Sequence, residues 1–156
     1  ITITIISKTK KPLLRTGVRD NHVVAFSGIL GNSAKDLKKL FNLGKLHDNS
    51  KFLNIQLREK LVQNTQRYLK AGMDISDGLF SDLDKIASAN SVGFKFNKSI
   101  QKNVACSGEE YEMLLIFDKR DKKAMIRRAQ QSRISLTVFA QVTRNRYTNR
   151  CKAHHF

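Results

Sequence analysis

Acidic and hydroxyl side chains gather in one short stretch, Met73–Leu79 (Met-Asp-Ile-Ser-Asp-Gly-Leu). Because Asp and Ser prefer turns and helix caps, we expect this stretch to lie where a strand passes into a helix. Asp74 and Asp77 would then lie close together, and two close carboxylates repel each other unless a cation binds there. Mg²⁺ suits such a site because it binds one or two carboxylates together with phosphate oxygens and water. The competing explanation, that Ser76 or Asp77 only caps the helix, is equally well supported.

A second polar cluster, Ser107–Glu112, comes directly before the most hydrophobic segment of the chain. Three carboxylates and one tyrosine at the edge of a strand suit a polar binding site. Taken alone, however, the cluster is better explained as a charged strand terminus that keeps the sheet edge soluble.

A glycine-containing turn, Gly28–Ser33, follows an apolar run and precedes an amphipathic segment. Backbone N–H groups at such a helix start can bind an anion, but a lone glycine-rich turn is not specific. The sequence contains no Gly-x-x-x-x-Gly-Lys-Ser/Thr motif, which excludes a P-loop enzyme.

The elements that must position these residues alternate between strands and helices, which predicts an α/β or α+β fold. Hydrophobic patterning predicts strands at 23–29, 92–96, 112–117 and 134–142. Helices are predicted at 33–44, at 50–70, from 79 onwards and at 119–132.

The first helix is expected to begin with a capping box formed by Ser33 and Asp36, and to end near Gly44. Its apolar stripe consists of Leu37, Leu40 and Phe41. In the 50–70 helix the residues expected on one side are Leu53, Leu57, Leu61 and Tyr68. The helix after Gly78 carries a second acidic pair, Asp82 and Asp84, and the residues expected to face inward are Leu79, Leu83, Ile86 and Ala87.

The charge of the chain is large and unevenly distributed. Its 156 residues include 29 Lys and Arg against 13 Asp and Glu, a formal net charge of +16. Residues 1–70 and 118–156 sum to +10 and +9, whereas residues 71–117 sum to −3 and hold both acidic clusters. An isoelectric point of about 10.2 motivates a nucleic-acid-binding hypothesis. The chain contains no recognised nucleic-acid-binding motif, so we do not expect a nucleic-acid partner.

The length suits one domain, or one and a fraction. No apolar run approaches the roughly 20 residues of a membrane helix, so no membrane partner is expected. Cys106 and Cys151 lie far apart without a CxxC motif, which excludes a disulfide framework as the basis of stability and favours a reducing cytoplasm. Cys151 with His154 and His155 lacks a fourth zinc ligand, so a polar C-terminal tail is the preferred interpretation.

Several stretches together resemble the thiamine-monophosphate kinases, a family within the aminoimidazole ribonucleotide synthetase superfamily. Residues 71–79 (Ala-Gly-Met-Asp-Ile-Ser-Asp-Gly-Leu) look like the family signature, and residues 108–112 (Gly-Glu-Glu-Tyr-Glu) resemble its Gly-Glu-Asp-Tyr-Glu. Residues 24–37 are similar to its strand–Thr-Gly-x-Leu-Gly-Asp-Ser–helix stretch. Residues 14–17 look like the Arg-Ser-Gly that precedes that stretch.

The resemblance spans nearly the whole chain and implies two parts. Residues 1–10 resemble the last strand and linker of a missing N-terminal ATP-binding domain, with the strand at Ile1–Ser7. Residues 11–156 resemble the C-terminal synthetase-like domain, a mixed β-sheet flanked by helices, and His155-Phe156 matches its usual ending. The family's N-terminal half bears Gly-Asp-Asp motifs and builds the dimer. We therefore expect a fragment, inactive without that half, of a homodimeric cytoplasmic enzyme.

The activity implied by the resemblance is ATP- and Mg²⁺-dependent phosphorylation of thiamine monophosphate to thiamine diphosphate. By resemblance, Asp74 and Asp77 are Mg²⁺ ligands. Ser76 and Arg15 would contact ATP, and Glu109 would face thiamine monophosphate, while no residue is assigned as catalytic. An acidic metal cluster in a basic protein suits phosphoryl transfer, which depends on positioning and charge neutralisation.

The chain departs from the family pattern at several positions. Asn32 and Glu110 each stand where the family usually has Asp, and residues 45–63 lack its Pro-x-Pro-Arg-like stretch. Ala153 replaces a commonly aromatic residue, which puts stacking on the thiamine moiety in doubt. The alternative functions are a basic nucleic-acid-binding module and a non-catalytic domain of the same fold.

Overall fold

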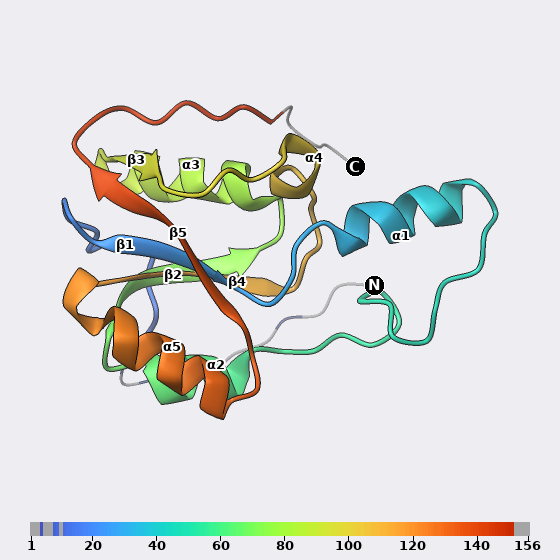
Figure 1. Cartoon of the computed structure of the whole chain (residues 1–156), viewed down its shortest axis with the longest axis horizontal. Coiled ribbons are helices and arrows are strands. Elements are labelled where there is room, and N and C mark those ends of the chain that lie inside the picture. Colours follow the sequence, from blue (N-terminus) through green and yellow to red (C-terminus); the bar gives the residue numbers. More distant parts are fainter. Residues whose placement is uncertain (1–3, 5–7, 10, 152–156) are drawn as a thin grey trace.

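The computed structural model describes residues 4, 8–9 and 11–151, which form a five-stranded β-sheet with helices on both faces (Figure 1). The strands lie in the order β2-β4-β1-β5-β3. Their bounds are Val23–Ser27 (β1), Leu69–Ile75 (β2), Gly93–Phe96 (β3), Glu112–Phe117 (β4) and Leu136–Thr143 (β5). The helices are Asn32–Phe41 (α1), Glu59–Thr65 (α2), Leu79–Asn90 (α3), Lys102–Ala105 (α4) and Lys122–Gln131 (α5), with a 3₁₀ turn at Lys119–Asp121 (η1). Helices α3 and α4 cover one face of the sheet, and α2 and α5 cover the other.

Every neighbouring pair of strands in the described part is antiparallel, so the expectation of a mixed sheet is wrong although the α+β class is confirmed. Strands β1 and β2, which α1 and α2 connect, run parallel to each other, but β4 lies between them. Strands β4 and β5, which α5 connects, likewise have β1 between them. Alternation of strands and helices indicates parallel partners, but it does not reveal that another strand is inserted between them.

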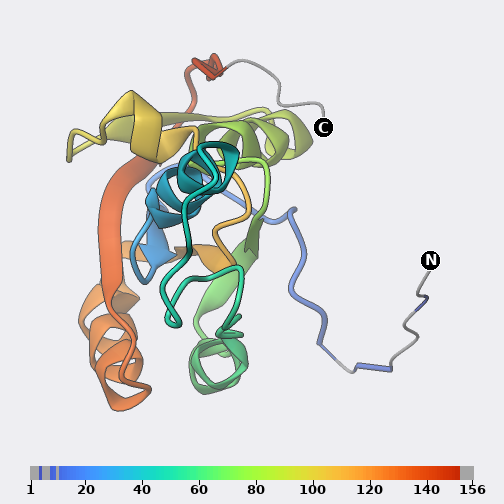
Figure 2. The same ribbon diagram turned by 90° about the vertical axis from the view of Figure 1, so that its right-hand side faces the viewer.

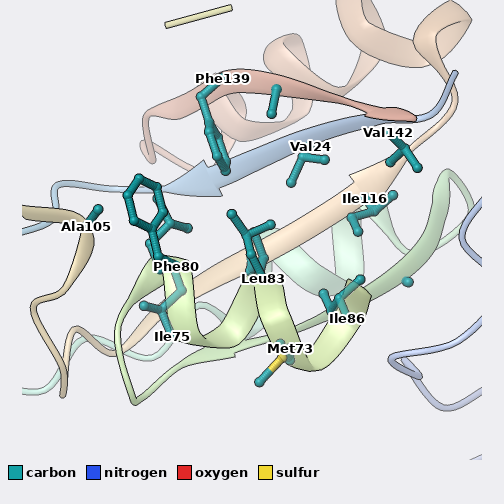
Figure 3. Close-up of a cluster of buried hydrophobic side chains, with 14 of the residues drawn as sticks. Val24, Met73, Ile75, Phe80, Leu83, Ile86, Ala105, Ile116, Phe139 and Val142 are labelled. Carbon is teal, nitrogen blue, oxygen red and sulfur yellow. The ribbon is translucent and has the colours of Figure 1, made fainter. Parts of the chain in front are cut away.

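The face covered by α3 holds the larger core, shown in Figure 3. Leu83 and Ile86 of α3 are fully buried and point toward the sheet, where Ile116 of β4 and Phe139 of β5 lie. All four residues expected to face inward from this helix are buried, which confirms that prediction. Because this packing fixes the direction of α3, it also fixes the turn that precedes the helix, where the first acidic motif lies.

Helix α1 starts one residue earlier than expected, and no side chain caps it. The Ser33 hydroxyl instead donates a hydrogen bond to the backbone oxygen of Glu109 (2.7 Å). The Asp36 carboxylate accepts one from the Ser50 hydroxyl (2.6 Å). The expected capping box is therefore wrong, because both side chains join α1 to distant segments rather than to its own first turn.

The segment after α1 departs furthest from the prediction. Helix α1 ends at Phe41 rather than near Gly44, and only α2 forms within the expected 50–70 helix. Four residues of the two expected apolar stripes are exposed, namely Leu40, Phe41, Leu53 and Leu57. The 42–58 loop instead runs from α1 along one end of the sheet to α2 (Figure 2). Two of its basic side chains bond to buried carboxylates, as described below, and this holds the loop in a non-helical path.

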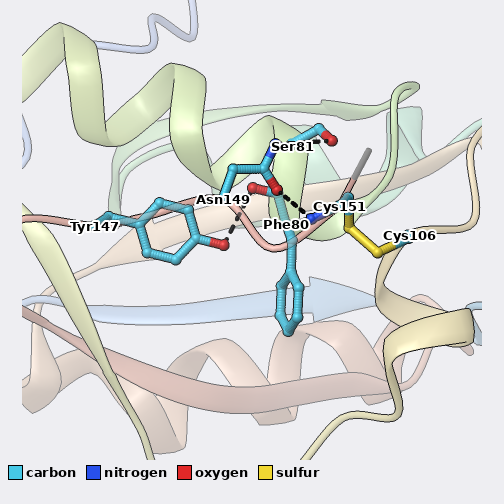
Figure 4. The surroundings of a disulfide bond; sticks show 6 residues. All are labelled: Phe80, Ser81, Cys106, Tyr147, Asn149 and Cys151. Atoms are coloured by element: carbon cyan, nitrogen blue, oxygen red, sulfur yellow. Dashed lines mark hydrogen bonds between the residues drawn. A yellow bond between two sulfur atoms is a disulfide. The ribbon is translucent and has the colours of Figure 1, made fainter. Parts of the chain in front are cut away.

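After β5 the chain turns back across α3, and Cys151 forms a disulfide with Cys106 (Cα–Cα 5.5 Å; Figure 4). The Tyr147 hydroxyl holds this return segment by donating to the backbone oxygen of Phe80 (3.2 Å). The interpretation of Cys151 as part of a polar tail is therefore wrong. The bond also removes the cysteine-based reason for expecting a reducing compartment, so cytoplasmic location stays a prediction.

Three expectations fall on residues outside the described part: most of the strand at Ile1–Ser7, the substitution at Ala153, and the ending His155–Phe156. The domain boundary near residue 10 stays a prediction. Among the described residues, no helix is both long and apolar enough to cross a membrane.

The buried His22 is expected to make stability depend on pH. Burial lowers its pKa below the ordinary 6.5, and its Nδ1 accepts a hydrogen bond from the Arg19 N–H (3.1 Å), which requires an unprotonated nitrogen. The unfolded chain then binds the proton more readily, so stability should fall as pH drops through 6.5 toward the folded-state pKa. Urea unfolding at about pH 7.5 and about pH 5.5 should show this loss for the wild type and much less for His22→Gln. The exposed His47→Gln should behave like the wild type, and an equal loss in His22→Gln would contradict the prediction.

Candidate active site

The two acidic motifs meet in space although they are far apart in the sequence. The Glu109 N–H donates to the backbone oxygen of Ser76 (2.8 Å), and the Glu110 N–H donates to the backbone oxygen of Ile75 (3.2 Å). Glu109 and Tyr111 both adopt left-handed backbone conformations, with φ of 52° and 53°. Such conformations are unfavourable for residues with a side chain and are often found at functional sites. The turn before β4 therefore presents Glu109 beside Ser76.

A pocket of about 120 Å³ lies between these motifs and the start of α1. Ser76, Asp77 and Glu109 line it together with Ser33 and Cys106. The structure thus brings together three of the five residues that the sequence assigns to a site. Arg15 and Asp74 do not line this pocket.

Asp82 organises the turn that carries Ser76 and Asp77. Its side chain is fully buried, and its Oδ2 accepts hydrogen bonds from the N–H groups of Ser76 (3.0 Å) and Asp77 (3.2 Å). Its Oδ1 lies 2.7 Å from the Lys85 ammonium. Burial raises the pKa of Asp82, and the bonds to Lys85 and the two amides only partly oppose this. The sequence analysis noted Asp82 only as one of an acidic pair with Asp84 and did not predict that it would accept these N–H groups. An Asp in the first turn of a helix is nevertheless a common partner for the preceding N–H groups.

Asp77 has a half-exposed carboxylate that forms an ion pair with Lys85. Burial lowers the pKa of Lys85, but the bonds to Asp77 and Asp82 outweigh this and raise it overall. Asp74 is exposed on β2, and its neighbours Met73 and Ile75 face the core under α3, so Asp74 points to the other side of the strand. The two carboxylates are therefore not brought together in one pocket.

Mg²⁺ is the metal that the resemblance implies for these carboxylates. Among the described residues, no three His, Cys, Asp or Glu side chains are grouped so as to hold a metal ion. A cage made only of protein ligands is therefore not present in this part of the chain. Asp77 at the pocket does fit the commoner mode, in which one or two carboxylates bind Mg²⁺ and phosphate oxygens and water complete its shell.

Arg15 lies at the far end of α3 from Ser76. Its backbone oxygen accepts a hydrogen bond from the side-chain amide of Asn90 (2.8 Å), the last residue of α3. Ser76 precedes the first turn of this helix, which at 12 residues is about 18 Å long. The structure does not bring the exposed Arg15 to the pocket, and its contact with ATP stays a prediction.

Glu110 is buried, and its carboxylate joins several segments of the chain, a role that the sequence did not predict. Its carboxylate accepts hydrogen bonds from the Gly31 N–H (2.8 Å), the Ser107 hydroxyl and the Lys51 ammonium (2.9 Å). Glu112 is buried as well, so the interpretation of this cluster as a solvated strand terminus is wrong for both residues. The burial of these two glutamates could have been suspected from the sequence, because they precede or begin a hydrophobic strand. Buried carboxylates need cationic partners, and the 42–58 loop supplies them.

No protein-family model matches the chain. In sequence, it is similar to a thiamine-monophosphate kinase of Aquifex aeolicus, with 26% identity in an alignment of 143 positions that covers 76% of this chain and 47% of the relative. A thiamine-monophosphate kinase of Leptospira interrogans is 28% identical in an alignment of 138 positions that covers 74% of this chain and 44% of that protein. The resemblance to the thiamine-monophosphate kinases is confirmed. The chain spans about half the length of the curated relatives it matches.

Solved structures of thiamine-monophosphate kinases share the fold. The enzyme from Stenotrophomonas maltophilia aligns with a TM-score of 0.75 at 18% identity, over 90% of this chain and 54% of that one. A structure of AaThiL complexed with AMPPCP and TMP gives a TM-score of 0.70 at 22% identity, over 87% of this chain and 50% of that one. These alignments confirm the expected α+β fold of the aminoimidazole ribonucleotide synthetase-like proteins.

Proposed function

We propose that this chain contributes part of the active site of a kinase that phosphorylates thiamine monophosphate, with ATP as the phosphoryl donor and Mg²⁺ as the metal. The observation that carries the proposal is the pocket in which the Asp-x-Ser-Asp-Gly turn meets the Gly-Glu-Glu-Tyr-Glu turn. Two similar proteins are named thiamine-monophosphate kinases, and one structural neighbour was solved with AMPPCP and TMP. Homodimer formation and cytoplasmic location belong to the same proposal.

Each side of the pocket has a separate task. The Asp-x-Ser-Asp-Gly turn faces the nucleotide: the Ser76 hydroxyl would donate to a phosphate oxygen, and Asp77 would hold Mg²⁺. Asp74 does not line this pocket and has no task in it. Bound Mg²⁺ would neutralise the charge that phosphate oxygens carry during transfer. Glu109, on the opposite turn, faces thiamine monophosphate.

Asp82 and Lys85 keep the nucleotide side of the pocket ordered. Asp82 fixes the backbone N–H groups of Ser76 and Asp77, so the turn is held in place before a ligand binds. Lys85 pairs with Asp77 in the structure, and Asp82 holds the same ammonium at 2.7 Å. Release of Asp77 toward a metal would leave Lys85 paired with Asp82 and close to the phosphates.

Calorimetric titration of the full-length protein with AMPPCP in the presence and absence of Mg²⁺ tests the nucleotide side. We expect Mg²⁺-dependent binding that Asp77→Asn weakens about tenfold or more, because a charge-assisted contact is lost. Asp48→Asn, an exposed loop carboxylate outside the pocket, is the matched control and should bind like the wild type.

The same titration with thiamine monophosphate separates the two sides of the pocket. Glu109→Gln should weaken binding of thiamine monophosphate and leave AMPPCP binding unchanged. The absence of Mg²⁺-dependent binding, or equal binding by Asp77→Asn and the wild type, would refute the assignment.

A further inference from the structure

A second and larger pocket lies on the other side of the first turn of α1. Its volume is about 300 Å³, and it shares no lining residue with the pocket that holds Ser76 and Glu109. The turn before α1, the 49–58 part of the loop, the start of β4 and the turn before β5 form its walls. None of the roles assigned above uses this cavity.

The floor of this pocket is a pre-formed ionic cluster. Glu112 is buried, and its carboxylate accepts hydrogen bonds from Nε and Nη2 of Arg58, both at 2.6 Å, and from the Ser27 hydroxyl, also at 2.6 Å. Gly28 makes room for it, because a Cβ at this position would lie 2.0 Å from Glu112 Oε1. The carboxylate is therefore fully engaged, and it fixes the plane of the Arg58 guanidinium at the pocket.

Arg58 has N–H donors that are not bonded to Glu112. A guanidinium carries five N–H groups, and the two bonds to Glu112 use two of them. Arg133 also lines the pocket, and its own backbone is left-handed (φ 56°). Its side chain has no hydrogen bond or ion pair with the described residues. The third cation, Lys51, is committed to Glu110, Glu112 and two backbone oxygens.

The remaining polar lining is made of side-chain amides, which come from Asn32, Asn49, Asn54 and Gln56. Amides offer both donors and acceptors and suit the neutral polar part of a small molecule. Two available guanidinium groups suit an oxyanion, since their forked N–H groups match carboxylate and phosphate oxygens. The cavity therefore has an anion-binding end and a polar, uncharged lining.

We propose that this pocket binds a small metabolite that carries an oxyanion, a phosphate or a carboxylate, between Arg58 and Arg133. Its volume is at the lower end of the range for small-molecule sites. The site is separate from the proposed kinase pocket, so it stands or fails independently of that function.

Amide NMR of the ¹⁵N-labelled chain, titrated with inorganic phosphate and separately with acetate at constant ionic strength, tests the proposal. We expect saturable shifts of the Gly28, Asn32 and Ser135 amides. Arg133→Gln should raise the dissociation constant about tenfold, as expected for loss of one charge-assisted contact. A response to phosphate alone would identify a phosphate site, and a response to both anions would identify a general oxyanion site.

Arg127→Gln is the matched control, because it removes the same charge from an exposed position of α5 outside the pocket. It should leave the dissociation constant unchanged. Equal weakening by Arg127→Gln and Arg133→Gln would overturn the proposal, since it would show attraction to the basic surface as a whole. Shifts confined to Ser76 and Glu109, or no saturable shift with either anion, would overturn it as well.

Discussion

Replacing Arg58 with methionine is expected to lower the free energy of unfolding by about 3 kcal/mol. The change leaves the Glu112 carboxylate buried without its bidentate partner, and loss of one partner of a buried ion pair is strongly destabilising. The effect should fall at the lower end of the usual range, because Lys51 Nζ still lies 3.3 Å from Glu112.

Urea unfolding of a double-mutant cycle provides the measurement. Arg58→Met/Glu112→Gln should lose clearly less stability than the sum of the two single variants, since the double variant buries no unpaired charge. Arg127→Met, on the exposed surface of α5, should change stability by no more than about 0.5 kcal/mol. Additive effects in the cycle would mean that the pair is not coupled and would contradict the prediction.

Replacing Asp82 with alanine is expected to cost about 2–4 kcal/mol of stability. It should also weaken Mg²⁺-dependent AMPPCP binding about tenfold or more, because the nucleotide-side turn loses its support. The substitution deprives the N–H groups of Ser76 and Asp77 of their acceptor and leaves Lys85 with only the half-exposed Asp77. Stability would be followed by urea unfolding and binding by calorimetry.

Two variants separate the role of Asp82 as acceptor from its role as charge. Asp82→Asn keeps a side-chain carbonyl for the two N–H groups and loses the ion pair with Lys85. Its free energy of unfolding and its affinity for AMPPCP should therefore lie between those of the wild type and those of Asp82→Ala. Asp84→Ala removes a carboxylate that has no hydrogen bond or ion pair in the described part of the chain and should bind AMPPCP normally. Normal binding by Asp82→Ala would show that the turn does not depend on Asp82.

The elements that matched the prediction are those whose burial is continuous or strictly periodic. The run at 112–117 became β4 with the predicted bounds, and all four predicted inward residues of α3 are buried. Periodic apolar residues fix which face of an element is buried regardless of what packs against it, so this information is local. The 50–70 helix failed because Lys51 and Arg58 bond to buried glutamates from another part of the chain, and these bonds hold the preceding loop away from helical geometry.

The candidate site was likewise predictable from the sequence only in part. The motifs identified Ser76, Asp77 and Glu109, and the fold brings these three to one pocket. No sequence pattern indicated that the Asp82 carboxylate would accept a hydrogen bond from the backbone N–H of Ser76, or that Cys106 in the pocket wall would form a disulfide with Cys151.

The amino-acid sequence limited the fold to the α/β or α+β class, and it identified the buried faces of α3 and β4 and the resemblance to the thiamine-monophosphate kinases, because these depend on local periodicity and short motifs. The strand order, the ionic cluster around Glu110 and Glu112 and the second pocket next to it became visible in the three-dimensional fold. A buried charge is stable only where distant segments supply its partners, and no local pattern encodes which segments those are.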